Sequence, residues 1–395
     1  MNRRLCILVV AILPVAAGCR MADRPSAGSG GGMPVAQSNA GPPRIERGVT
    51  DVQTSEEPAG VLLLRDVLAL AVSRSPDLRS YPYEFRAADA RTVQAGLRRN
   101  PELAAEVEEF AGAGDRSGFD GAETTIRIDQ PIELAGKRAK RARVARLDRE
   151  LTEWDYAAAR LDVIREATQA FVAVLAAQDR VVLTGKLVEL SRQAQLAVAQ
   201  RVEAGRDSPV DGLRASVAYS TSQIELQKAE RALNAARHKL AAVWGGKTAG
   251  FERVSGDLYE LSPPVLLADA ADAVAANPDV KRWRTHEQKT RAMLRLEKAE
   301  AVPDVTIGAG VMRFEETDDS ALVVGLSVPI PLFDRNQGGI REAVAEVAKT
   351  RRQYEAAEIQ TLAALSEAVN TMSAAYEEAT ILRGLRDEGL ILPAH

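Results

Sequence analysis

The stretch Gln130-Pro131-Ile132-Glu133-Leu134 returns as Val328-Pro329-Ile330-Pro331-Leu332, 198 positions (329 − 131) further along the chain. A period near 200 residues is far longer than the roughly 20–50 residues of a solenoid repeat and is typical of a duplicated domain. Two earlier landmarks return in the same order at a shift of 202 (278 − 76): Ser75–Leu78 as Asn277–Val280, and Asn100–Leu103 as Val302–Val305. The landmark at residue 131 returns at the smaller shift of 198, which predicts a loop of variable length between it and the two earlier landmarks.

Each copy contains two stretches in which apolar residues alternate with small or polar ones. In the second copy these are residues 305–311 and 322–328, separated by a polar turn at 315–320; in the first copy residues 123–129 alternate after a looser stretch at 102–110. A period of two predicts β-hairpins, and each stretch has about the length of a tilted transmembrane strand, roughly 9–11 residues. We expect these side chains to face lipid: Thr124, Ile126, Ile128, Val305, Ile307, Val311, Leu322, Val324 and Leu326. We expect these to face a lumen: Thr306, Gly325 and Ser327.

Alternation alone does not distinguish a membrane-embedded hairpin from one in water, because a half-buried hairpin of a soluble domain has the same pattern. No further strands are predicted, and four strands per chain cannot close a barrel. In lipid, open strand edges with unpaired N–H and C=O groups are prohibitively costly. Two alternatives follow: the hairpins lie in water, or several chains share one barrel.

A long helical stretch follows each hairpin. Residues 136–203 contain no proline and repeat apolar residues at intervals of three and four, which predicts a coiled-coil seam on a helix about 100 Å long. The turn Ala204–Pro209 offers a C-terminal glycine, an N-cap serine and an N1 proline, and predicts reversal into a returning helix over residues 210–244. The expected seam residues are Leu147, Leu151, Trp154, Ala158, Leu161, Ile164, Thr168, Phe171 and Leu175. Shorter helices are predicted at residues 62–73, 80–99 and 266–301, with breaks at Pro76, Pro82 and Pro278.

The first 19 residues are typical of an export signal. Two arginines precede an apolar stretch, residues 5–15, that is too short to span a bilayer, and Ala16–Cys19 resembles a bacterial lipobox. Cys19 is therefore the predicted site of lipidation, and the Gly/Ser-containing stretch after it is the predicted tether. An ordinary signal peptide with an incidental cysteine is the alternative.

Composition and charge argue against several classes of function. The net charge of −4 argues against nucleic-acid binding, and the two cysteines and three histidines lie too far apart in sequence to predict a metal site or a disulfide framework. No arrangement of Ser, His and carboxylates suggests catalysis. We therefore predict neither an enzyme nor a cofactor.

The motifs at the hairpin–helix junctions and at the helical turn resemble the TolC-like outer membrane efflux protein family. The junction motifs are Gln130–Ile132 with Gly136–Arg138, and Val328–Gly338 in the second copy. The motif Pro-Leu-Phe-Asp-Arg-Asn-Gln-Gly is similar to sequences of the branch that serves heavy-metal resistance pumps (CzcC-like, CusC-like). The turn is similar to the family's periplasmic tip, which implies adaptor docking by Arg201, Gly205, Asp207, Ser208 and Asp211.

The resemblance implies a mainly α fold with transmembrane β-hairpins, assembled as a homotrimer whose twelve strands form one outer-membrane barrel above an α-helical barrel. It further implies the passive exit duct of a tripartite efflux system, docked through a periplasmic adaptor (membrane fusion protein) onto an inner-membrane RND transporter and exporting substrates such as heavy-metal cations. The alternative class is a periplasmic coiled-coil lipoprotein with a structural or adaptor role. Such a protein would not need two hairpins of membrane length.

The expected organisation is a lipoprotein signal peptide at residues 1–19, a flexible linker at 20–60, a first efflux repeat at 61–262 and a second, incomplete repeat at 263–395. A second tip would fall near residue 399 (201 + 198). We therefore expect a fragment or a naturally shortened product, and we expect this chain to fail in efflux until the missing helix is restored.

Two groups of charged residues have alternative interpretations. A basic run at the start of the first long helix opposes the helix dipole and needs compensation; it either lies against anionic phospholipid head groups or forms a solvated face. At the turn, Asp207 and Asp211 either narrow the pore for cations or pair with an adaptor, and for Asp211 a favourable interaction with the dipole of the returning helix is a further alternative. The basic run comprises Lys137, Arg138, Lys140, Arg141, Arg143 and Arg146.

Overall fold

The computed structural model describes residues 57–265 and 274–387, all within one compact unit, residues 42–395. The predicted signal peptide, its Cys19 and nearly all of the predicted linker lie outside the described residues. None of the described helices combines the length and the apolar character needed to cross a bilayer.

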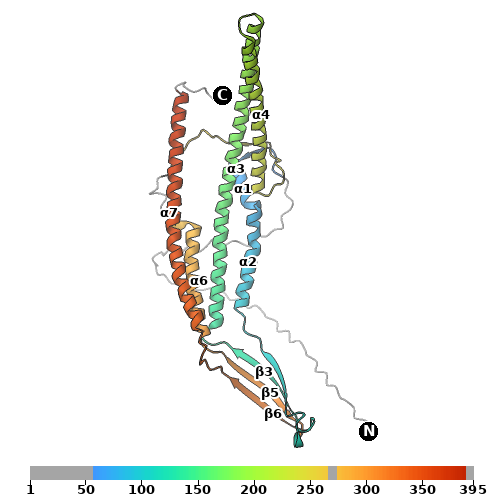
Figure 1. Ribbon diagram of the computed structural model, residues 1–395. Helices are drawn as coiled ribbons and strands as arrows, with labels where there is room; N and C mark the ends of the chain where they lie inside the picture. Colours follow the sequence, from blue (N-terminus) through green and yellow to red (C-terminus); the bar gives the residue numbers. More distant parts are fainter. Residues whose placement is uncertain (1–56, 266–273, 388–395) are drawn as a thin grey trace, which may run out of the picture. The chain divides into compact units, whose positions relative to one another are not determined.

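The order short helix, β-hairpin, long helix occurs twice along the chain, as the repeated landmarks predicted (Figure 1). In the first repeat these elements are α2 (Pro76–Ala95), β2 (Glu102–Glu108), β3 (Glu123–Ile132), α3 (Lys137–Glu203) and the returning helix α4 (Pro209–Val243). In the second repeat they are α6 (Pro278–Glu300), β5 (Val305–Phe314), β6 (Asp319–Ser327) and α7 (Gln337–Asp387). The prolines at the first position of α2 and α6 explain both starts, because proline lacks only an N–H that would have no partner there.

The two hairpins form one antiparallel four-stranded sheet in the order β2-β3-β5-β6. The register sets Ile126 opposite Val311 and Val311 opposite Leu322. Because directly opposed residues share a face and side chains alternate along each strand, all nine residues predicted to be lipid-facing lie on one face of the sheet. The hairpins of the two repeats therefore present a single continuous apolar surface.

The prediction that there are no further strands is wrong. Strands β1 (Val61–Leu63) and β4 (Arg253–Ser255) form a parallel two-stranded ladder, so the first helix, α1 (Leu64–Arg74), starts after β1 and not at residue 62. The side-chain amide of Gln178 in α3 both accepts from Val254 N–H and donates to Val254 C=O, each at 3.0 Å. Strands this short carry little sequence signal, because distant partners supply their hydrogen bonds.

The predicted break at Pro82 is also wrong, because α2 continues through it. Proline removes one helical hydrogen bond, but the packing on both sides of it holds the helix. Tyr81 and Phe85 contact Tyr156 of α3, edge to face, with ring centroids 5.3 and 5.9 Å apart. The predicted break at Pro278 is confirmed, since Asn277 caps α6 through its side chain.

The single coiled-coil seam predicted on α3 is only partly correct. Leu147, Trp154 and Phe171 are buried as expected, but Leu161 is 51% exposed. Helix α3 contacts both α2 and α6 around residues 148–156, and it contacts α1 and α4 farther along, so its buried side changes with its neighbours. A straight helix also drifts from a 3.5-residue repeat by about 20° per heptad.

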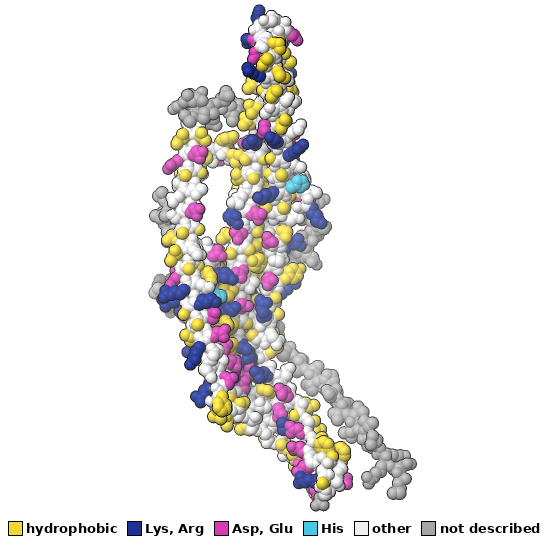
Figure 2. All heavy atoms as spheres, viewed as in Figure 1, with side chains coloured by type: hydrophobic (Ala, Val, Ile, Leu, Met, Phe, Trp, Pro, Cys, Tyr) yellow, Lys and Arg dark blue, Asp and Glu magenta, His cyan; other side chains and the backbone are white. Residues whose placement is uncertain are grey.

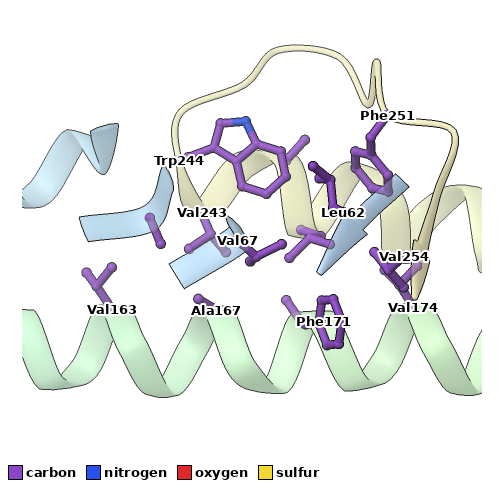
Figure 3. Packing of buried hydrophobic residues seen from close by; sticks show 14 of the residues in the cluster. Leu62, Val67, Val163, Ala167, Phe171, Val174, Val243, Trp244, Phe251 and Val254 are labelled. Atoms are coloured by element: carbon purple, nitrogen blue, oxygen red, sulfur yellow. The ribbon is translucent and has the colours of Figure 1, made fainter. Parts of the chain in front are cut away.

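The main core lies where α1, β1, β4 and α4 pack on the middle of α3 (Figure 3). Val67 and Val174 are fully buried there, and Trp244 packs edge to face against Phe251. In the second repeat, α7 packs on α6 and buries Ala343 and Thr350. No residue after Thr350 is buried in the described part of α7.

Candidate channel wall and docking tip

The apolar face of the sheet has no covering within the described chain. On β6, Leu322, Val324 and Leu326 are 85%, 80% and 71% exposed, and Ile126 and Ile128 on β3 are also exposed. Such a patch is unusual for a surface in contact with water. The face is therefore a candidate contact surface, although its exposure to lipid is still a prediction.

The opposite face of the sheet is polar and carries charge. Arg127 pairs with Glu106 on the neighbouring strand (Nη2 to Oε1, 3.1 Å) and with Asp129 on its own strand (Nε to Oδ2, 2.9 Å). These side chains lie across glycines of β5: a Cβ added at Gly310 would stand only 2.6 Å from the Arg127 Cβ, and one at Gly308 would overlap the Asp129 carboxylate. The glycines thus leave room for charged groups on the predicted lumen side.

An ion cluster around the buried Lys137 joins the two repeats where the sheet meets the helices. Lys137 at the start of α3 donates to Asp304 (Nζ to Oδ1, 2.7 Å) and lies 3.5 Å from Glu300; its side chain is 4% exposed. Asp304 also accepts from Leu134 N–H at 3.1 Å. Burial favours the protonated acid, but these two hydrogen bonds and the Lys137 charge hold the pKa of Asp304 below its usual range.

A second pair compensates the basic run beside this cluster. Arg141 donates to both carboxylate oxygens of Glu133, and this hydrogen bonding, against the opposing effect of burial, lowers the pKa of Glu133. Lys137 is therefore neither solvated nor available to lipid, which corrects both interpretations for this residue, whereas Arg141 is paired with Glu133 but stays 30% exposed. Arg138, Arg143 and Arg146 are exposed, so the alternatives stay open there. Figure 2 shows acidic and basic side chains gathered at this junction.

The turn between α3 and α4 closes as the sequence predicted. Gly205 has φ +69°, and the N–H groups of Gly205 and Arg206 bond the carbonyls of Val202 (2.9 Å) and Arg201 (2.8 Å), a Schellman motif. The side chain of Ser208 accepts from Val210 N–H at 3.2 Å and caps α4, with Pro209 at its first position. These hydrogen bonds give partners to backbone groups at the end of α3 and at the start of α4.

The structure brings four of the five predicted tip residues into one turn. The Arg201 guanidinium bonds Asp207 (Nη2 to Oδ1, 2.9 Å) and so closes the loop that contains Gly205, and Ser208 follows directly as the cap of α4. Asp211 lies in the first turn of α4 and pairs with Arg214 at 3.4 Å. The adaptor-docking role of all five residues stays a prediction.

The hydrogen-bond partners that hold the segment between β6 and α7 were not predicted from the sequence. Asn336, with φ +55°, donates from its amide to Glu297 C=O (2.9 Å) and to the Glu297 carboxylate (2.7 Å), fixing the segment before α7 to α6. No periodic pattern marks such a contact. Within the described parts of the chain, no group of three or more His, Cys, Asp or Glu side chains is arranged to hold a metal ion.

The chain shares its fold with solved outer-membrane proteins. The structure of CusC, described as a study of transmembrane channel formation, covers 89% of this chain and 90% of its own, with a TM-score of 0.65 and 16% identity. The outer membrane protein VceC from Vibrio cholerae covers 79% of each chain, with a TM-score of 0.63 and 18% identity. The fold is therefore that of the helical and β-hairpin channel proteins.

Sequence comparison gives the family. The family described as outer membrane efflux protein matches residues 67–246 and 270–388, and the chain belongs to this family. It is 31% identical over 331 residues, 83% of this chain, to the cobalt-zinc-cadmium resistance protein CzcC of Cupriavidus metallidurans, and spans 77% of that protein. It is 27% identical to the nickel-cobalt-cadmium resistance protein NccC of Alcaligenes xylosoxydans xylosoxydans, over 82% of this chain and 72% of that protein. These relatives place it in the heavy-metal resistance branch.

Proposed function

We propose that the chain is the outer-membrane exit duct of a tripartite efflux system and passes its cargo outward without chemistry of its own. The observation that carries this is the sheet: one face is apolar and uncovered, the other is polar and charged, and the register keeps the two apart along all four strands. That is the arrangement of a barrel wall between lipid and a lumen.

We further propose that three copies share one barrel. The sheet has strands β2 and β6 at its edges. An edge of unpaired N–H and C=O groups is prohibitively costly in lipid, so the edges must pair with other copies. Three copies would supply twelve strands, as the family resemblance implies, with the α3–α4 hairpins continuing the tunnel into the periplasm.

The proposed cargo is heavy-metal cations, because the relatives are named for resistance to cobalt, zinc, cadmium and nickel. The proposed partners are a periplasmic adaptor at the α3–α4 tip and, through it, an inner-membrane RND transporter. The tip supports docking because its turn is held by an ion pair and a Schellman motif. We propose two efflux repeats, at residues 61–262 and 263–395, behind a signal peptide, a linker and a lipid anchor on Cys19.

Adjacent valines on opposite faces of β6 give a matched test of the wall. Single cysteines at Val323 and Val324 should react very differently with a membrane-impermeant thiol reagent, since only the Val323 position would face water. Val324→Arg should destabilise the membrane-inserted protein, at a cost of about 2–4 kcal/mol near the membrane midplane. Equal labelling of both positions would contradict the duct and favour the periplasmic lipoprotein.

A further inference from the structure

The polar face of the sheet carries charge of almost one sign. Directly opposed residues share a face, so the register places six carboxylates and a single guanidinium, that of Arg127, on this side of the four strands. The whole chain is nearly balanced, with 55 acidic and 51 basic residues. A face that only needed to be solvated could carry either sign, so Arg127 is the exception on an acidic surface. The carboxylates belong to Glu102, Glu106, Glu108, Glu123, Asp129 and Asp319.

Two of these carboxylates hold the Arg127 side chain. The guanidinium bonds both carboxylate oxygens of Glu106 on the neighbouring strand, Nη2 to Oε1 at 3.1 Å and Nη1 to Oε2 at 3.3 Å. Its Nε donates to Oδ2 of Asp129 at 2.9 Å. Only the planar fork of an arginine can serve both partners in this way. We call Arg127, Glu106 and Asp129 the ion clasp.

Small residues beside Arg127 make room for the ion clasp. Ala104 on β2 and Gly310 on β5 stand directly opposite Arg127, one on each side. Gly308 leaves similar space beside Asp129, since an added Cβ would overlap that carboxylate. Because both acceptors belong to the wall, the bonded guanidinium stays beside the wall, where two negative charges face its single positive charge.

A released arginine would act differently on a cation that passes this face. Without its two partners the long side chain is free to extend from the wall and to present an uncompensated positive charge. Rings of charged side chains set the ion selectivity of pores, with acidic rings favouring cations and basic rings favouring anions. The position of the Arg127 charge therefore matters in addition to the net charge of the face.

We propose that the ion clasp determines the ion selectivity of the duct. Glu106 and Asp129 are positioning residues that hold the Arg127 charge against the wall and so keep the lumen permissive for cations. The proposal rests on the proposed function, because only a lumen gives this face a cargo. The competing view is a solvated face on which net charge alone matters.

Ion selectivity of the full chain tests the clasp. The purified protein, checked for assembly, is inserted into planar bilayers between KCl solutions of different concentration, and the reversal potential gives the preference for potassium over chloride. Glu106→Gln breaks the clasp, whereas Glu102→Gln removes the same charge from the same strand and face and leaves the three bonds to Arg127 in place. Arg127→Lys keeps every formal charge but offers one nitrogen in place of the fork.

We expect the reversal potential to move farther toward zero, which means lower cation selectivity, in Glu106→Gln than in Glu102→Gln. It should move the same way in Arg127→Lys and recover when Arg127→Gln is added to Glu106→Gln. Equal shifts in the two single glutamine variants, or a wild-type potential in Arg127→Lys, would overturn the clasp and leave the duct standing. Assembled wild-type protein that passes no current would overturn the proposed function as well.

Discussion

Lys137 carries a positive charge at a helix start, a position where a positive charge is unfavourable. A lysine at the first position of a helix opposes the helix dipole, and its side chain here is almost fully buried. Asp304 and Glu300 from the other repeat compensate it. Because the lysine comes from one repeat and both acids from the other, the cluster fixes the two hairpins relative to each other.

Replacing Asp304 should therefore be costly. Asp304→Asn removes the nearer charged partner of a buried ammonium group and leaves Glu300, 3.5 Å away, as its remaining carboxylate, and we expect a loss of about 3 kcal/mol in the free energy of unfolding. Urea denaturation of the detergent-solubilised protein, followed by circular dichroism, measures it. The control is Asp162→Asn, which breaks an exposed pair with Arg165 and should cost less than about 1 kcal/mol. Equal effects would contradict the structural role of the cluster.

The same residue should make stability depend on pH. The pKa of Asp304 is lower in the folded state than its ordinary value of 3.8, so the carboxylate contributes stability that is present above pH 3.8 and is lost as the pH falls through the lower folded pKa. In the wild type, urea denaturation should show this loss at the acid end of the pH range. In Asp304→Asn this part of the acid-induced loss should disappear.

Among the strands, the two glycines Gly310 and Gly325 of the second hairpin have different surroundings. Gly310 on β5 lies under Arg127, and an added Cβ would stand 2.6 and 2.7 Å from the Arg127 Cβ and Cα. Gly325 on β6 occupies the same face of the sheet but has open space around it. The first glycine is required by packing between the repeats, whereas the second is not.

Alanine at these two positions should give opposite results. Gly310→Ala forces β3 and β5 apart and should destabilise the sheet by about 1–3 kcal/mol, as overpacking does elsewhere. Gly325→Ala should be neutral or slightly stabilising, since glycine weakens a strand interior. Thermal unfolding of the two variants side by side checks this. A harmless Gly310→Ala would mean that β3 and β5 are not in this register.

For the whole molecule, a lipid anchor and a barrel wall are two independent ways of holding the protein at a membrane. If both are present, loss of the anchor alone should leave the protein in the membrane, because burial of the sheet's apolar face is retained. A coiled-coil lipoprotein would instead become soluble. The two classes of protein therefore differ in a single fractionation experiment.

Cys19→Ser should abolish incorporation of labelled palmitate and leave the chain in the outer-membrane fraction, extractable only by detergent. Metabolic labelling and membrane fractionation of the full-length protein measure the two properties. Labelling that survives the substitution would contradict lipidation at Cys19. Release into the soluble periplasmic fraction would contradict the membrane hairpins.

The sequence by itself determined every feature whose cause is local. The period of two in residues 305–311 places those side chains on alternate faces, the proline-free run of α3 makes one uninterrupted helix of 67 residues, and the glycine, serine and proline of the 204–209 turn close the tip. Each depends on residues within a few positions of one another. For that reason the strands of the two hairpins, the long helix and the tip were predictable.

The tertiary structure alone decided the features that depend on distant partners. The β1–β4 ladder and the Gln178 amide that completes it join segments about 75 to 190 residues apart in sequence, and the Lys137–Asp304 bond spans 167 residues. Pro82 stays helical because aromatic rings of α3 hold α2, and the buried side of α3 follows its successive neighbours rather than one heptad pattern. Such contacts leave no periodicity in the sequence, because each of these residues contacts a partner that is distant in the chain and is brought near it only by the fold.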